Sequence, residues 1–136
     1  MAALAKDRNT VSRAATKLSI AVAASVKIYA GALVAVNASG YATPGATAIT
    51  LKAIGRADEQ VDNSSGGDGD LKVEVSKGVF RYDNSASSDA ITTAEIGSEC
   101  YIVDDQTVAK TDGAGTRSKA GTVFDVDSDG VWVDMR

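Results

Sequence analysis

Apolar and polar residues alternate with a period of two along most of the chain beyond residue 16. The clearest alternation places Leu18, Ile20, Val22 and Ala24 on one side of the chain, and Leu71, Val73 and Val75 repeat the pattern later. This period is typical of β-strands with one buried face. Clusters of Gly, Asn, Asp and Ser separate the apolar stretches about every 8–12 residues, which is the spacing of strands in sandwiches and barrels. The expected strands lie at 17–24, 26–29, 33–36, 49–54, 71–75, 79–82, 100–103, 107–109, 122–126 and 131–135.

We therefore predict an all-β fold, a small β-barrel or sandwich of short antiparallel strands with at most one short helix. The helical signal is a single turn at 92–96. Residues 1–16 are rich in Ala and charged groups and poor in large apolar side chains, so they are predicted to form an N-terminal arm. Residues 17–136 are predicted to form a single β-rich domain, because no linker divides them and their number is ordinary for one domain.

The pattern also predicts a hairpin in the middle of the chain. The turn Ser76-Lys77-Gly78 joins the expected strands at 71–75 and 79–82. The segment before this hairpin, 63–70, is rich in Gly, Ser and Asp, so we expect it to be a loop.

A second hairpin is expected to close the chain, with its loop at Asp127–Gly130. Trp132 lies on the face of this hairpin that points away from the core. Either another strand or a protein partner covers such a side chain, and Trp is enriched at protein interfaces. The cross-strand pairs expected on the core face are Val126 with Val131, Phe124 with Val133, and Thr122 with Met135.

Composition excludes several kinds of active site. The chain has 136 residues, no His and a single Cys, Cys100. Without His there is no His-based acid–base catalysis, no Ser–His or Cys–His pair and no His-containing zinc site. A single Cys rules out an internal disulfide and CxxC redox chemistry. We therefore expect a protein that is not an enzyme and that needs no cofactor and no metal.

Two segments partly match calcium-binding motifs. Asp125-x-Asp127-x-Asp129-Gly130 fits the first half of an EF-hand loop, but its twelfth position is Arg136, where a bidentate Glu is needed. Gly66-Gly67-Asp68-Gly69-Asp70 begins like a β-roll repeat, but it occurs once and has Leu71 where the repeat needs Asp. We interpret the first segment as a hairpin turn and the second as a flexible loop.

Two further candidates for chemistry also have plainer interpretations. Cys100 has no cationic neighbour in sequence, so we expect a small buried apolar side chain rather than a nucleophile. Asp104 and Asp105 are adjacent, and adjacent side chains in a strand point to opposite faces. We therefore expect a solvated turn there rather than a pair of catalytic carboxylates.

Charge is divided along the chain. Residues 1–56 carry seven basic side chains and one acidic one, a net +6, whereas residues 57–136 carry seven basic and 17 acidic ones, a net −10. Such a dipole suits head-to-tail pairing with copies of the chain or with a mixed-charge scaffold, although charges scattered over solvated faces give the same count. The basic residues form no run, so no nucleic-acid partner is expected.

The sequence predicts neither a targeting segment nor a membrane segment. The basic residues near the N-terminus follow a short apolar stretch, whereas those of a signal peptide precede a long one. The longest apolar segment, Leu18–Ala24, is far below the ~20 residues of a membrane span. The protein is expected to stay in a reducing cytoplasm unless it leaves inside a particle.

Several segments between residues 28 and 135 follow each other in a familiar order. They are Ala30–Val36, Ala53–Ala57, Val73–Phe80, Ile96–Asp105, and Ala120–Asp127 with Gly130–Val133. This order resembles small head proteins of tailed phages and prophages, namely capsid decoration (cement) proteins and a related uncharacterised prophage family. The shared motifs are structural, mostly glycines and apolar strand positions, so no functional residue is carried over.

The resemblance implies a virion protein that sits on the capsid exterior after assembly in the bacterial host cytoplasm. Such a protein binds the major capsid protein, commonly as a homotrimer, and stabilises the shell, without nucleic acid, membrane or small-molecule substrate. The candidate interface residues of this chain are Lys6, Arg8 and Arg13 of the arm, together with Trp132.

Two other functions remain as alternatives. A carbohydrate- or surface-binding β-module of a phage tail or cell surface needs exposed aromatic side chains, and the chain has two Phe, four Tyr and one Trp. A small carboxylate-dependent hydrolase needs two carboxylates in one pocket, for which the aspartates of the closing hairpin are the candidates.

Overall fold

The structure is a computed structural model that describes residues 2–136, and its fold is all-β, as the alternation predicts. Two single-turn 3-10 helices, η1 (Ser87–Asp89) and η2 (Thr93–Glu95), lie between strands, and η2 falls on the predicted turn. The strands are β1 (Lys17–Ala21), β2 (Lys27–Ile28), β3 (Leu33–Val36), β4 (Ala42–Pro44), β5 (Lys52–Ala57), β6 (Val61–Asp62), β7 (Lys72–Ser76), β8 (Val79–Asn84), β9 (Glu99–Ile102), β10 (Thr107–Ala109), β11 (Lys119–Asp127) and β12 (Gly130–Asp134).

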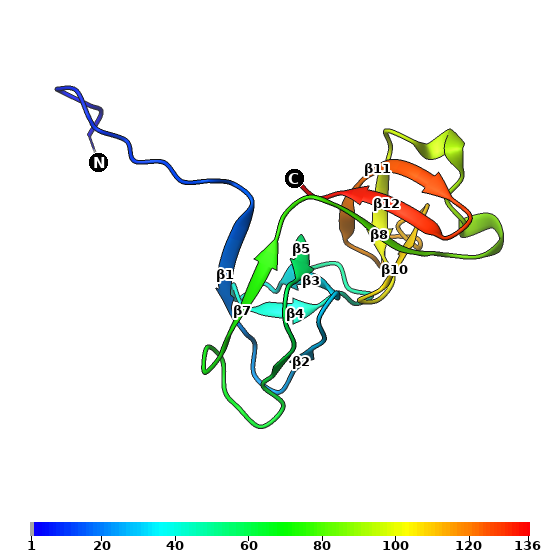
Figure 1. Cartoon of the computed structure of the whole chain (residues 1–136), viewed down its shortest axis with the longest axis horizontal. Helices are drawn as coiled ribbons and strands as arrows, with labels where there is room; N and C mark the ends of the chain where they lie inside the picture. The colour runs from blue at the N-terminus through cyan, green and yellow to red at the C-terminus, as the bar shows by residue number, and fades with distance from the viewer. Residues whose placement is uncertain (1) are drawn as a thin grey trace.

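The strands build a five-stranded sheet and a closed barrel that lie side by side (Figure 1). The sheet has the order β1-β7-β5-β3-β4 and is antiparallel throughout. The barrel has the order β10-β8-β12-β11-β9, and β8 and β10 pair in parallel, unlike the antiparallel strands expected. Strands β2 and β6 form a separate two-stranded ribbon. The barrel prediction is therefore confirmed, with an open sheet added to it.

Strand β3 is the wall between two hydrophobic clusters. Leu33 and Ala35 pack into the barrel cluster, Val34 packs into the sheet cluster, and all three side chains are 0% exposed. Successive side chains of a strand point to opposite faces, so an uninterrupted apolar strand serves two cores. The barrel cluster also contains Tyr82, Ile91, Cys100, Ile102, Val108, Ala120, Val123, Val131, Val133 and Met135, and the sheet cluster contains Val22, Ile28, Ala32, Ala42, Ala57, Val61, Val73 and Val75.

The predicted hairpin in the middle of the chain is wrong. Strand β7 pairs with β1 and β5 in the sheet, whereas β8 pairs with β12 and β10 in the barrel. The segment 76–78 therefore carries the chain from one half to the other. Val73 and Val75 are buried in the sheet cluster, while Tyr82 is buried in the barrel cluster, so the two strands bury their apolar faces in different places.

The closing hairpin is confirmed, but its register is only partly as expected. Val126 does pair with Val131. A β-bulge between Val123 and Asp125 then shifts the strand, so that Val123 is opposite Val133 and Phe124 is 56% exposed. The expected pairs of Phe124 with Val133 and Thr122 with Met135 are therefore wrong. A bulge adds one residue to one strand, which exchanges the two faces from that point on.

The carboxylate of Asp58 links the ends of three strands of the sheet, β1, β5 and β7. Asp58 accepts a hydrogen bond from Ser76 Oγ at 2.6 Å and one from Arg56 Nη2 at 3.0 Å, and Lys17 Nζ lies 3.6 Å from it. Burial by itself raises the pKa of Asp58, but the hydrogen bonds and the two cations outweigh burial and hold that pKa below its usual value. The ionised carboxylate therefore stabilises the fold above about pH 4, and this contribution is lost as the pH falls further.

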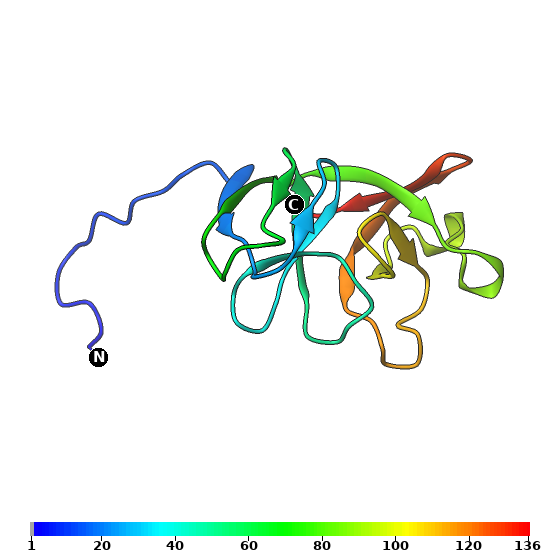
Figure 2. The ribbon, with the colours of Figure 1, turned by 90° about the horizontal axis from the view of Figure 1, so that it is seen from below.

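The N-terminal segment leads away from the rest of the molecule in two perpendicular views (Figure 1 and Figure 2). Residues 2–16 contain no helix or strand, and every one of them is exposed. They meet the body where Lys77 N donates to the carbonyl of Thr16 at 2.8 Å, next to the start of β1. The division into an arm at 1–16 and a single domain at 17–136 stays a prediction, and Met1 lies outside the described residues.

Truncating the shared strand is expected to weaken both halves at once. Leu33→Ala leaves a hole in the barrel cluster and is expected to lower the free energy of unfolding by about 2–5 kcal/mol. Leu71→Ala, at a position that is 43% exposed, is the matched control and is expected to cost less than about 1 kcal/mol. Urea unfolding followed by two spectroscopic probes measures both values. Two separate transitions in Leu33→Ala would contradict a single domain.

Candidate functional site

The arm presents charged and apolar side chains without partners from its own body. Lys6, Arg8 and Arg13 are exposed, and within residues 2–136 the structure records no ion pair for any of them. Leu4 and Val11 are 72% and 83% exposed, although both are aliphatic. Three cations and two apolar groups on an extended segment are the groups that a partner's acidic and apolar surface would contact.

A second surface feature is the Trp132 surface, which consists of the exposed Arg81 and the half-buried Arg56, Phe80 and Trp132. Trp132 pairs with Arg81 across β12 and β8, and Arg81 Cζ lies 5.7 Å from the centroid of the indole ring. Arg56 Cζ lies 4.7 Å from the centroid of the Phe80 ring. Each guanidinium therefore makes a cation–π contact with an aromatic ring. The four side chains line a hollow of about 530 Å³, together with Gly31, Val79 and Tyr82.

Trp132 lies away from the barrel core, as the hairpin pattern predicts. Its neighbours Val131 and Val133 are fully buried, whereas Trp132 is half-buried. Its Nε1 donates to Asp127 at 2.8 Å, and this hydrogen bond holds the pKa of Asp127 below its usual value. Among the described residues, the Arg81 side chain lies over the indole ring. The Nε1–H group of the indole is thus fixed by a hydrogen bond, and the rest of the ring leaves apolar area for a partner.

The hydroxyl of Tyr82 is an unusual group beside this surface. Tyr82 is 5% exposed, and its hydroxyl has no hydrogen-bond partner among the described residues. Burial raises the pKa of Tyr82, so the hydroxyl stays protonated at any physiological pH. A buried polar group without a partner costs free energy.

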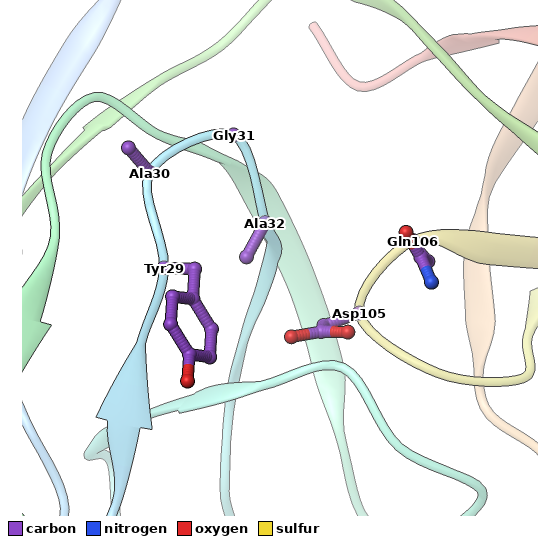
Figure 3. A pocket seen from close by; sticks show the side chains of 6 residues that line it. All are labelled: Tyr29, Ala30, Gly31, Ala32, Asp105 and Gln106. Atoms are coloured by element: carbon purple, nitrogen blue, oxygen red, sulfur yellow. The ribbon is translucent and has the colours of Figure 1, made fainter.

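A third feature is a hollow of about 400 Å³ at Tyr29, shown in Figure 3. One wall is the turn between β2 and β3, and the other is the loop between β9 and β10. Tyr29 is 55% exposed, and the side chains of Asp105 and Gln106 line the opposite wall. The sequence analysis missed this hollow, because its two walls lie far apart in the chain.

The aspartates of the closing hairpin are engaged by groups of their own turn and by Arg81. Asp125 accepts a hydrogen bond from Val126 N at 2.8 Å, and Asp127 accepts one from Asp129 N at 2.8 Å besides the Trp132 bond. Asp129 lies 3.8 Å from Arg81 Nη1. Among residues 2–136, no group of three His, Cys, Asp or Glu side chains is placed to hold a metal ion. These carboxylates therefore build the turn.

The interpretation of Cys100 as a buried apolar side chain is confirmed. It is 0% exposed, and burial raises the pKa of its thiol to about 12. The thiol therefore stays protonated at neutral pH and is a poor nucleophile.

The interpretation of the acidic pair as a turn is confirmed as well. Asp104 and Asp105 lie in the bend between β9 and β10, and Asp104 accepts a hydrogen bond from Gln106 N at 2.9 Å. The segment 63–70 is a loop too, but it is anchored, because Asn63 is 2% exposed and donates to the carbonyl of Ala23 at 2.8 Å.

The structure changes the interpretation of the charge dipole. Residues 17–78, which build the sheet half, carry six basic and six acidic side chains, whereas residues 79–136 carry five basic and eleven acidic ones. All five basic side chains of the barrel half form ion pairs with its own carboxylates. The remaining contrast is between a basic arm and a barrel with a net charge of −6.

We compared the chain with protein-family models, curated proteins and solved structures, and none of them matches. Among residues 2–136, no helix has the length and apolar character needed to cross a lipid bilayer. Function is therefore inferred from the fold and from the three surface features described above.

Calcium is expected to leave the melting temperature of the protein unchanged. The aspartates that resemble a calcium loop already serve the backbone of their own turn, Trp132 and Arg81. The measurement is thermal unfolding in millimolar calcium and in excess chelator. A ligand that binds the folded state raises its stability by mass action. A melting temperature several degrees higher in calcium would therefore show that Asp125–Asp129 bind the ion.

Proposed function

We propose that this chain is a structural protein of a phage virion, which binds the outside of the capsid as a homotrimer and stabilises the shell. Its principal partner is then the major capsid protein, and its role is structural rather than enzymatic. The order of segments between residues 28 and 135 suggests the kind of partner, and the exposed arm supplies a means of attachment.

The arm is the single observation that carries the proposal. Residues 2–16 are exposed along their whole length, and a 15-residue extended chain reaches about 50 Å at most. Leu4 and Val11 expose apolar area that a monomer gains nothing by exposing. An arm of this kind contributes little to its own fold but binds well to a neighbouring surface, because a long segment gathers many weak contacts.

The charge distribution supports a repeated assembly. A basic arm and a barrel with a net charge of −6 are complementary surfaces on one chain, so the arm of one copy is attracted to the barrel of another. Closed cyclic symmetry lets every copy use both surfaces, and a trimer matches the local three-fold positions of an icosahedral shell.

The Trp132 surface is the proposed contact between subunits of the trimer. It combines Trp and Arg side chains, which dominate the binding energy of many protein interfaces. Arg56 joins it from the sheet half and the other three residues come from the barrel, so a partner at this surface contacts both halves of the molecule.

A carbohydrate- or surface-binding module of a phage tail or cell surface is the second candidate function. The observation that favours it is the hollow at Tyr29, whose lining includes an exposed aromatic ring, a carboxylate and an amide. The two functions are compatible, because the hollow and the arm use different residues.

Deleting residues 2–16 is expected to leave a folded domain that no longer binds its particle. Residues 2–16 form no helix or strand and are all exposed, and their backbone hydrogen bond to the body is the one that Lys77 N donates to Thr16, so the circular dichroism spectrum and the melting temperature are expected to stay close to those of the full chain. Binding is measured by co-sedimentation with shells that lack the protein. A control in which Lys6, Arg8 and Arg13 become Gln separates charge from apolar contacts, and its remaining binding is expected to depend less on salt. Full binding by the deleted chain would refute the role of the arm.

Truncating the indole ring is expected to weaken the trimer without unfolding the subunit. Trp132→Ala removes a candidate interface anchor, and such truncations often cost on the order of 2 kcal/mol of binding free energy or more. The matched control is Phe124→Ala, which truncates an exposed aromatic side chain elsewhere on the barrel. Mass measurements on shells and in solution compare the two variants. Equal binding and equal oligomeric state in both would show that Trp132 is not an interface residue.

A further inference from the structure

The two walls of the Tyr29 hollow are held in fixed positions by backbone hydrogen bonds. In the first wall, Ala32 N donates to the carbonyl of Tyr29 at 3.1 Å, which closes the turn. In the second wall, the carbonyls of Asp105 and Gln106 accept from residues of β3 and β8. The donors are Leu33 N at 2.8 Å and Asp83 N at 2.7 Å. The hollow is therefore preorganised, because neither wall has to move to receive a ligand.

The hollow offers one aromatic ring and two polar side chains (Figure 3). Its volume of about 400 Å³ is within the range of roughly 300–1,000 Å³ that is usual for small-molecule sites. Within residues 2–136 no hydrogen bond is recorded for the Asp105 carboxylate, for the Gln106 amide or for the Tyr29 hydroxyl, so all three groups are available to a ligand. By contrast, the neighbouring Asp104 carboxylate is used by its own turn.

We propose that this hollow binds a neutral sugar ring, which stacks on Tyr29 and hydrogen-bonds to Asp105 and Gln106 through its hydroxyls. The C–H face of a pyranose is apolar with slightly positive hydrogens, and it fits the negative face of an aromatic ring. Its hydroxyls both donate and accept. The carboxylate accepts from them and the amide does both, so a polyhydroxylated ligand satisfies every polar group of the hollow.

The charges around the hollow select against other ligand classes. Lys27 Nζ lies 4.9 Å from the centroid of the Tyr29 ring, although Lys27 does not line the hollow. That ammonium repels a cationic ligand that would otherwise stack on the ring. The Asp105 carboxylate repels an anionic ligand in the same way. A neutral ring is the class of ligand that neither the Lys27 ammonium nor the Asp105 carboxylate repels.

This site would give a shell-bound protein a second activity, namely weak attachment to glycans outside the particle. The sugar site does not rest on capsid binding, because Lys6, Arg8, Arg13 and Trp132 lie outside the hollow. The two proposals therefore fail separately. Repetition over many copies on a shell multiplies a weak sugar contact into a strong one.

The test is a titration of the full chain followed by NMR of its backbone amides. The probes are glucose, galactose, mannose and N-acetylglucosamine, with the tetramers of glucose and of N-acetylglucosamine, each up to about 20 mM. At least one probe is expected to shift the amides of residues 29–32 and 105–106, with a Kd on the order of 1 mM. Choline, a cation that stacks on aromatic rings, is included as the competing ligand class.

Three variants make the result specific. Tyr29→Ala is expected to weaken the binding of the sugar at least tenfold. Phe124→Ala removes an equally exposed aromatic ring elsewhere and is expected to leave sugar binding unchanged. Gln106→Ala is the third variant, and it is expected to weaken sugar binding severalfold, which keeps the test decisive if Tyr29→Ala does not fold. The proposal is overturned if no sugar shifts these amides, if choline saturates the hollow in place of the sugars, or if Phe124→Ala loses binding as Tyr29→Ala does.

Discussion

The double burial of β3 is the constraint on which the rest of the structure depends. Leu33 and Ala35 belong to one core and Val34 to the other, so this short strand cannot move without opening both. Because of the position of β3, a loop from the sheet half and a loop from the barrel half lie next to each other. Leu33 N holds the loop at Asp105, and the turn that begins at Tyr29 leads directly into the strand. The exposed hollows therefore lie along the line where the sheet meets the barrel.

The interior leaves little chemistry for a reaction. The Cys100 thiol is buried with a raised pKa, and the aspartates of the closing hairpin bond to their own turn. The side chains that remain available are on the surface, where Trp132, Tyr29 and the arm present aromatic, apolar and charged groups. Side chains of these kinds are common at binding surfaces, and the proposed structural role uses them. The β-scaffold holds Trp132 and Tyr29 in place, whereas the arm extends away from it.

Local sequence signals predicted most of the strands, although not β4 and β6, but tertiary packing decided how the strands pair. The alternation around Val73 and Val75, and the apolar stretch at β3, marked strands correctly because the period of two reflects a buried face. The predicted hairpin of β7 with β8 is wrong because a short turn does not fix which strands pair, and each of the two strands buries its apolar side chains in a different core. The register at Phe124 failed because Val123 and Phe124 are both apolar, and a bulge decides which one points inward. The hollow between Tyr29 and Asp105 had no local signal, since topology alone brings its walls together.

Attachment to a capsid through the arm is the central claim, and a cryo-EM reconstruction of particles that carry the protein tests it most directly. The account predicts three copies of the β-domain around local three-fold axes on the outer surface of the shell. It also predicts ordered density for residues 2–16 along a neighbouring subunit, and Trp132 at a contact between copies. Isolated copies away from any three-fold axis, density inside the shell, or arms that extend freely into solvent would contradict it.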